Sequence, residues 1–280
     1  VSMFSTASKD SKRFNRGDQA DSSAYIFNYK DIPQWVRAQR YSWHGVDFMY
    51  HGQTDFDKFY VDYLETLMGV DNSVGRVLDY LKANGLDKET LVIYMGDNGF
   101  SFGEHGLIDK RHAYEESMRV PLLARSPALI KAGTNVKEMV LNVDIAPSIL
   151  EMAGVKKPKQ MQGTSFLPLM KGDPVQNWRK EVFYEYYWEN PFPQTPTQYA
   201  VRTDRYKFIR SQGVWDIDQL YDLQQDPYEL NNLIRKPELQ DLAKDLNKKL
   251  WDWLSDTQGL YIPLKPIGDK KFDHVYKGTW

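Results

Sequence analysis

The sequence of 280 residues contains no cysteine, no excess of one charge and no long apolar run. Without cysteine it has no disulfide, zinc finger, iron–sulfur cluster or thiol nucleophile. Its 36 Lys and Arg residues nearly balance 38 Asp and Glu residues, which argues against a nucleic-acid backbone as a partner. No stretch approaches the ~20 apolar residues of a membrane-spanning helix, so we expect no membrane span. Hydrophobic residues make up 41% of the chain, which is enough for a sizeable core.

The first residues, Val1–Asp18, are polar and lack an initiating methionine. They are typical of the interior of a loop and carry no signal-peptide pattern. We therefore expect a piece of a longer protein, whose preceding part is missing or belongs to another chain.

The periodicity of residues 56–155 is that of an α/β protein. Apolar residues at helical spacing predict a long helix from Phe56 that ends at Asn84-Gly85. The apolar run Thr90–Met95 then predicts a buried parallel strand. A second apolar run, Val120–Arg125, precedes a turn region, and residues 144–154 predict a short helix.

Composition changes at Lys156–Asp173, which is rich in Lys, Pro and Gly. We place a boundary here and expect two parts, residues 1–155 and residues 156–280. Aromatic and alternating segments between residues 181 and 223 predict a small antiparallel sheet. An amphipathic helix is predicted to begin at Pro237.

Candidate functional residues lie in the segment after the predicted strand. Asp97 and Asn98 lie where the strand ends, at the edge of an α/β sheet where ligands bind. A carboxylate beside an amide oxygen suits a hard cation such as Ca²⁺ better than zinc. The competing interpretation is a plain turn, since Asp-Asn-Gly is common in that role.

Basic side chains follow in the same segment. Lys110 and Arg111 add positive charge, and His105 and His112 are candidate hydrogen-bond donors. Such a set suits an anionic tetrahedral group on a metal. For both histidines the alternative is a surface or core role.

Three blocks, in order, carry a resemblance to a known family. They are Asp71-Asn-Ser-Val-Gly-Arg, the run from Asp97-Asn-Gly through Gly-Glu-His-Gly-Leu to Asp-Lys-Arg, and Leu220-Tyr-Asp-Leu. Together they resemble the C-terminal half of the type I sulfatase family. Ser42-Trp-His-Gly-Val-Asp is similar to bacterial carbohydrate sulfatases, of the N-acetylglucosamine-6-sulfatase-like branch.

The resemblance implies an alkaline-phosphatase-like α/β/α sandwich with a smaller C-terminal subdomain of antiparallel sheet plus helix. It implies hydrolysis of a sulfate ester on a sugar, with Ca²⁺ held by Asp97, Asn98 and two upstream Asp residues. Lys110 matches the lysine that contacts the sulfate. The residues matched to the substrate pocket or its neighbourhood are Trp43, His44, His105, Arg111 and His112. A secreted or periplasmic location is also implied.

The family's nucleophile is a formylglycine made within a Cys/Ser-x-Pro-x-Arg motif, which this sequence does not contain. We therefore expect the chain alone to be inactive and to need a missing N-terminal half, whether upstream in the same protein or on a separate chain. Two alternatives stay open. One is a phosphatase or phosphodiesterase of the alkaline phosphatase superfamily, against which Asn98 argues. The other is a non-catalytic glycan-binding fragment, which the retention of Asp97, Asn98 and Lys110 disfavours.

Overall fold

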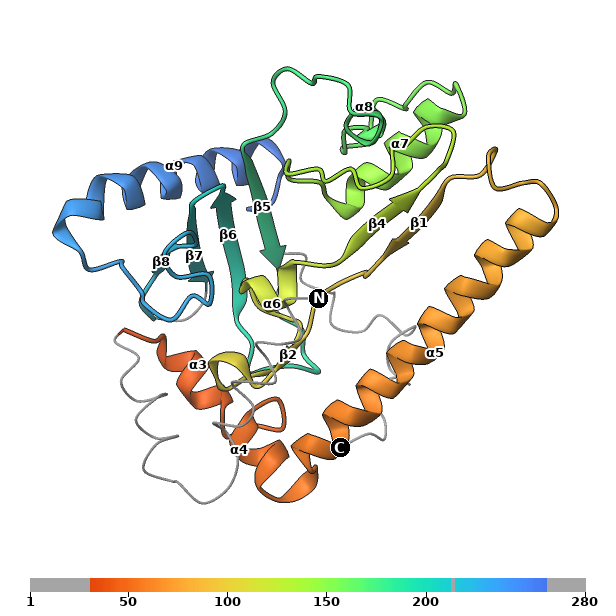
Figure 1. The fold of residues 1–280 in the computed structure, drawn as a ribbon. Helices are drawn as coiled ribbons and strands as arrows, with labels where there is room; N and C mark the ends of the chain where they lie inside the picture. Colours follow the sequence, from red (N-terminus) through yellow and green to blue (C-terminus); the bar gives the residue numbers. More distant parts are fainter. Residues whose placement is uncertain (1–30, 213–214, 261–280) are drawn as a thin grey trace, which may run out of the picture.

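The computed structural model describes residues 31–212 and 215–260. The segment Val1–Asp18, discussed above, lies outside these residues. In Figure 1, a four-stranded sheet with one long helix across it lies beside a pair of short strands, and a second long helix runs along the far side of that pair. No helix in the two described ranges is long and apolar enough to cross a membrane.

The N-terminal helices are α3 (Gln34–Gln39), α4 (Val46–Phe48), a π-helical turn (Met49–Gln53) and α5 (Phe56–Ala83). Helix α5 begins where Asp55 accepts a hydrogen bond from the Lys58 amide at 3.0 Å. It ends at Asn84, followed by Gly85 in the left-handed region, which confirms the predicted helix and its stop. Only Tyr60 among its residues is buried, so most of its apolar face is open.

Strands β1 (Val92–Met95) and β4 (Leu122–Arg125) form an antiparallel pair. The prediction of a buried parallel strand at Thr90–Met95 is therefore wrong for the described residues, because the chain returns beside β1 in the opposite direction. The strand is also only half-buried. On one side of this pair, α7 (Ile145–Met152) and α8 (Leu167–Lys171) form a small core with Leu122 and Ala124.

Between β1 and β4 the chain forms short elements that carry most of the candidate residues. They are β2 (Ser101–Phe102), the 3₁₀ turn Glu104–Gly106, β3 (Ile108–Asp109) and α6 (Glu115–Met118). A further 3₁₀ turn, Asn142–Asp144, leads into α7.

The predicted antiparallel sheet and amphipathic helix are both present. The strands are β5 (Glu181–Tyr186), β6 (Thr197–Thr203), β7 (Tyr206–Gln212) and β8 (Gln219–Asp222), in that spatial order. Helix α9 (Gln240–Asp256), preceded by a 3₁₀ turn at Pro237–Leu239, covers one face of the sheet. Because side chains alternate along a strand, Tyr199 and Val201 face α9, whereas Ala200 packs with Leu107 and Tyr114 on the other face.

Buried ion pairs join the sheet to the loop segment. Lys207 of β7 is fully buried, and its Nζ lies 2.9 Å from Glu115 Oε1 and 2.7 Å from Glu229 Oε1. It also donates a hydrogen bond of 2.9 Å to the Ala113 carbonyl. Burial alone raises the pKa of Glu115, but Lys207 and Arg202 lower it to about 2. This lysine therefore fixes α6 against the sheet.

Candidate active site

The structure brings Asn98 and Lys110 together. Lys110 Nζ donates a hydrogen bond to Asn98 Oδ1 at 3.2 Å, and both lie on the loops that follow β1 and β3. Asp97 is exposed, and its Oδ1 accepts a hydrogen bond from the Asn98 amide at 2.9 Å. The predicted metal pair and the predicted sulfate-binding lysine thus share one corner of the molecule.

Close packing holds this corner in place. A Cβ at Gly99 would lie 1.9 Å from the Glu116 carbonyl oxygen, so only glycine fits there. The Gly99 amide donates to the Ser117 carbonyl at 2.9 Å. On the other side, Asn142 Nδ2 donates to the Asp97 carbonyl at 2.8 Å. The loop therefore has a defined backbone before any ligand binds.

A second group forms around Asp109, whose carboxylate is buried. Arg111 Nη1 lies 2.6 Å from Asp109 Oδ1, and His44 Nδ1 lies 3.1 Å from Asp109 Oδ2. Burial raises the pKa of the Asp109 carboxyl, but the hydrogen bond from His44 and the charge of Arg111 bring it below its ordinary value. Asp109 is thus an anion that orients both side chains.

Aromatic rings complete this second group. Trp43 is half-exposed and lies 3.9 Å from the His44 ring, measured between ring centroids. Phe192, from the loop between β5 and β6, places its ring 3.4 Å from Arg111 Cζ. Three segments far apart in the sequence therefore meet here, and they bring together the predicted residues Trp43, His44 and Arg111.

His105 and His112 do not belong to either of these two groups. His112 is fully buried, its Nδ1 lies 2.7 Å from Ser117 Oγ, and burial lowers its pKa to about 4. His105 stacks on Tyr114 with ring centroids 3.8 Å apart, and its Nε2 lies 3.6 Å from Glu116 Oε2. The positions of both rings are explained by packing inside the protein. Their roles in substrate binding stay predictions.

His105, Glu116 and Glu229 offer ligand atoms that all lie within 4.8 Å of one another. The ammonium of Lys207 already lies against Glu229 and supplies positive charge at this point. We therefore assign no metal to this buried cluster.

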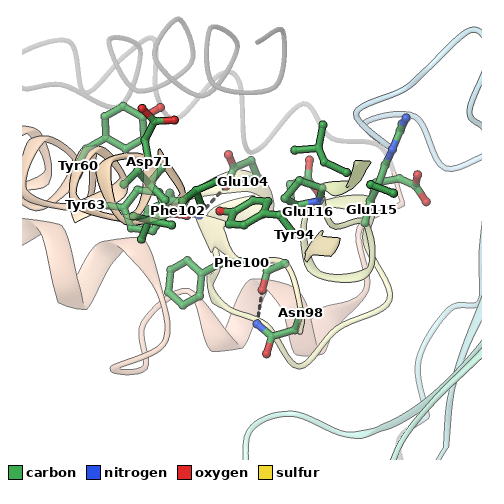
Figure 2. A pocket seen from close by; sticks show the side chains of 18 of the residues that line it. Tyr60, Tyr63, Asp71, Tyr94, Asn98, Phe100, Phe102, Glu104, Glu115 and Glu116 are labelled. Carbon is green, nitrogen blue, oxygen red and sulfur yellow. Dashed lines mark hydrogen bonds between the residues drawn. The ribbon is translucent and has the colours of Figure 1, made fainter. Parts of the chain in front are cut away.

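A groove of about 1290 Å³ lies between α5 and the β1–β4 pair, and Asn98 is among the residues that line it. Its walls are largely apolar, with Phe59, Tyr63 and Val74 from α5 facing Tyr94 and Leu123 from the strands. Figure 2 shows Asn98 near Phe100, with Tyr94 and Phe102 between it and the rings of α5.

Comparison with known proteins identifies the family. A family model described as "Sulfatase" matches residues 5–155, and one described as "N-sulphoglucosamine sulphohydrolase, C-terminal" matches residues 103–256. The chain belongs to the sulfatase family. The resemblance seen in the sequence blocks is thereby confirmed.

Named relatives agree with this assignment. The chain is 38% identical over 225 residues to an N-acetylglucosamine-6-O-sulfatase of Bacteroides thetaiotaomicron, covering 80% of this chain and 39% of that one. It is 33% identical over 207 residues to an N-acetylglucosamine-6-sulfatase of Bos taurus, covering 62% and 37%. The chain therefore spans about two fifths of the length of these curated relatives.

Solved structures show the same fold. One is BT4656 in complex with its substrate D-glucosamine-2-N,6-O-disulfate, with a TM-score of 0.69 and 36% identity, covering 75% of this chain and 43% of that one. Another, BT1596, a 2-O GAG sulfatase, has a TM-score of 0.72 and 23% identity, covering 87% and 53%. The predicted alkaline-phosphatase-like α/β fold is confirmed.

Sequence reasoning missed Asp109, Phe192 and Asn142. Asp109 directly precedes Lys110 and Arg111, and a carboxylate next to two cationic residues was the available signal that it could pair with one of them. Phe192 and Asn142 come from separate elements, the loop between β5 and β6 and the 3₁₀ turn Asn142–Asp144, and sequence spacing does not show that they meet the other site residues.

Proposed function

We propose that this chain is the C-terminal portion of a carbohydrate sulfatase that removes a sulfate ester from a sugar of the glucosamine type. The contact between Lys110 Nζ and Asn98 Oδ1 carries the proposal, because it places a cation beside the candidate metal pair. The similarity to N-acetylglucosamine-6-sulfatases supports the substrate class.

Lys110 is the catalytic residue of the proposal. Cleavage of a sulfate ester builds negative charge on the oxygen that leaves the sulfur. An ammonium fixed at that point stabilises the charge more in the transition state than in the ground state. Its bond to Asn98 keeps the flexible lysine side chain oriented.

The side-chain oxygens of Asp97 and Asn98 are suitable ligands for calcium. Both supply oxygen, as Ca²⁺ requires, but two side chains fall well short of its six to eight ligands. The remaining ligands would come from the upstream half, together with the formylglycine nucleophile. When bound, the ion would neutralise charge on the sulfate oxygens.

Substrate recognition falls to Trp43, His44 and Arg111. The half-exposed Trp43 ring offers a face for a sugar ring, and Arg111 offers donors for sugar oxygens or a second sulfate. His105 and His112 would contribute indirectly, because their packing fixes the backbone of the segment that carries Lys110.

The partner of the chain is the N-terminal half of the catalytic domain, whether joined to it or a separate polypeptide. The groove beside α5 supports this, because two apolar residues that line it, Val70 of the helix and Leu123 of β4, are exposed to 36% and 62%. Open apolar surface of this kind marks an interaction site. We propose a secreted or periplasmic location, on family resemblance.

The test combines this chain with the N-terminal half of the 38%-identical Bacteroides relative and measures sulfate release from N-acetylglucosamine 6-sulfate. Lys110→Ala should lower kcat by about 10²–10³, the usual cost of one donor that stabilises transition-state charge. Asp97→Ala should raise the Ca²⁺ concentration needed for half-maximal rate. Lys131→Ala, at an exposed lysine, is the control. An unchanged kcat in Lys110→Ala together with an unchanged Ca²⁺ requirement in Asp97→Ala would contradict the proposal.

A further inference from the structure

The loop between β5 and β6 places one aromatic ring among the proposed substrate-binding residues. The Phe192 ring lies 3.4 Å from Arg111 Cζ. The same ring lies 5.2 Å from the His44 ring and 6.1 Å from the Trp43 ring, at 26° to each. One side chain of the C-terminal portion therefore packs against all three.

The loop that carries Phe192 is itself fixed. The Phe192 amide donates to the Glu189 carbonyl at 2.9 Å, which closes a turn. Thr195, a few residues on, is fully buried, and its Oγ1 accepts a hydrogen bond of 3.1 Å from the buried Gln39 Nε2. The ring is thus presented by an anchored loop.

Arg111 is held from several directions at once. Asp109 Oδ1 accepts a short hydrogen bond of 2.6 Å from its Nη1, Glu189 Oε1 lies 3.6 Å from its Nε, and Phe192 covers the face of the guanidinium. A cation over an aromatic face is stabilised by the ring quadrupole, and a planar guanidinium also stacks on it. A long side chain that would otherwise sample many rotamers is confined before substrate arrives.

We propose that Phe192 is a positioning residue that holds Arg111 in its substrate-binding orientation. This inference rests on the proposed function, because it takes Arg111 to contact the sugar. Phe192 acts on binding and not on bond cleavage, since its ring packs against Arg111, His44 and Trp43, the residues proposed to recognise the sugar. Loss of the ring should therefore raise KM and leave kcat unchanged.

The kinetic test uses the combined enzyme described above. Phe192→Leu keeps an apolar side chain in the loop and should raise KM about three- to ten-fold, within the range of a cation–π contact, with kcat within about two-fold. Phe192→Tyr, which keeps the ring, should restore KM. In an Arg111→Ala background, Phe192→Leu should have no further effect. Trp215→Leu, at a fully exposed ring elsewhere in the C-terminal portion, is the control.

A spectroscopic test needs no activity and uses the chain itself. The ring current of Phe192 should shift the Arg111 Nε–H resonance in ¹H–¹⁵N spectra, with Arg111→Lys identifying the signal. Phe192→Leu should move that resonance towards the position of a free arginine, and Phe192→Tyr should not.

The two tests separate the inference from the proposed function. An unchanged Arg111 resonance and an unchanged KM in Phe192→Leu would overturn the positioning role. A fall in kcat in Phe192→Leu with unchanged KM would overturn it as well. Absence of sulfate release by the unsubstituted combined enzyme would overturn the proposed function, while the resonance would still decide whether Phe192 orders Arg111.

Discussion

The four-stranded sheet with α9 and the β1–β4 pair with α5 are built from similar residues but differ in burial. In the first region, Tyr199 and Val201 of the sheet and Leu250 of α9 have no exposed surface. In the strand pair, Leu123 is 62% exposed, and Met68 on α5 is 67% exposed. Two strands alone are marginally stable in water. The first region completes its own core, whereas the second presents surface suited to another layer of structure.

The largest expected effect is at the junction between the two regions. Lys207→Met should destabilise the chain by about 3–5 kcal/mol, because it removes the ammonium from the buried carboxylate of Glu229 and leaves Glu115 with Arg202 alone. Chemical denaturation followed by circular dichroism measures the change. Lys244→Met removes an exposed pair with Asp241 and should cost less than about 0.5 kcal/mol. An equal loss of unfolding free energy in the two variants would mean that the buried ion pairs of Lys207 do not stabilise the junction.

A slightly smaller effect is expected inside the sheet region. Leu250→Ala should cost about 2–4 kcal/mol, because it opens a cavity in the core between α9 and the sheet. Met68→Ala on α5 removes a side chain of similar size that is mostly exposed, and should cost little. The two free energies of unfolding, measured side by side, compare the regions directly. A large loss from Met68→Ala would show that α5 is already packed.

A pH effect should come from His112, below the active-site loop. Burial lowers its pKa to about 4, whereas the unfolded chain holds the proton below about 6.5. The folded state therefore loses stability as the pH falls from about 6.5 to 4, by up to about 1.4 kcal/mol per pH unit. In His112→Gln this slope should be shallower. Comparing the two proteins at each pH cancels other buried groups, such as Glu104, whose pKa burial raises to about 7. Parallel slopes would contradict a buried neutral imidazole.

The smallest effect on the chain alone should come from the open face of α5. Val77→Asp should change the free energy of unfolding by no more than about 0.5 kcal/mol, since the side chain is half-exposed. The same change should weaken association with the N-terminal half, because it buries a charge in an apolar contact. Sedimentation of the mixed halves measures this. Unchanged association would place the partner elsewhere.

Local pattern was enough to predict the elements that carry strong periodicity. Helix α5 and its stop at Gly85 follow from apolar spacing and from a glycine in the left-handed region. Helix α9 follows in the same way, since its buried residues Ala243, Leu246, Leu250 and Leu254 recur at the three- and four-residue spacing of an amphipathic helix. The direction of β1 was not predictable, because strand pairing depends on segments remote in sequence.

In the site, too, residues within one segment could be predicted, whereas contacts between distant segments could not. Asp97, Asn98 and Lys110 lie in one segment with recognisable residues, and Asn98 and Lys110 do meet. Lys110 is exposed, whereas His112, two residues later, is fully buried. The backbone conformation of the loop decides which side chain is buried, and sequence spacing does not show it. The contact of Phe192 with Arg111 joins two parts of the chain and needed coordinates to be seen.

Sulfate release from N-acetylglucosamine 6-sulfate shows whether this chain contributes half of a calcium-dependent active site. It should be measured for this chain alone and for the chain combined with the N-terminal half of its Bacteroides relative, each with Ca²⁺ and with a chelator. We expect release only from the combined protein with Ca²⁺. Robust metal-dependent release by the chain alone, or release by the combined protein that survives the chelator, would contradict it.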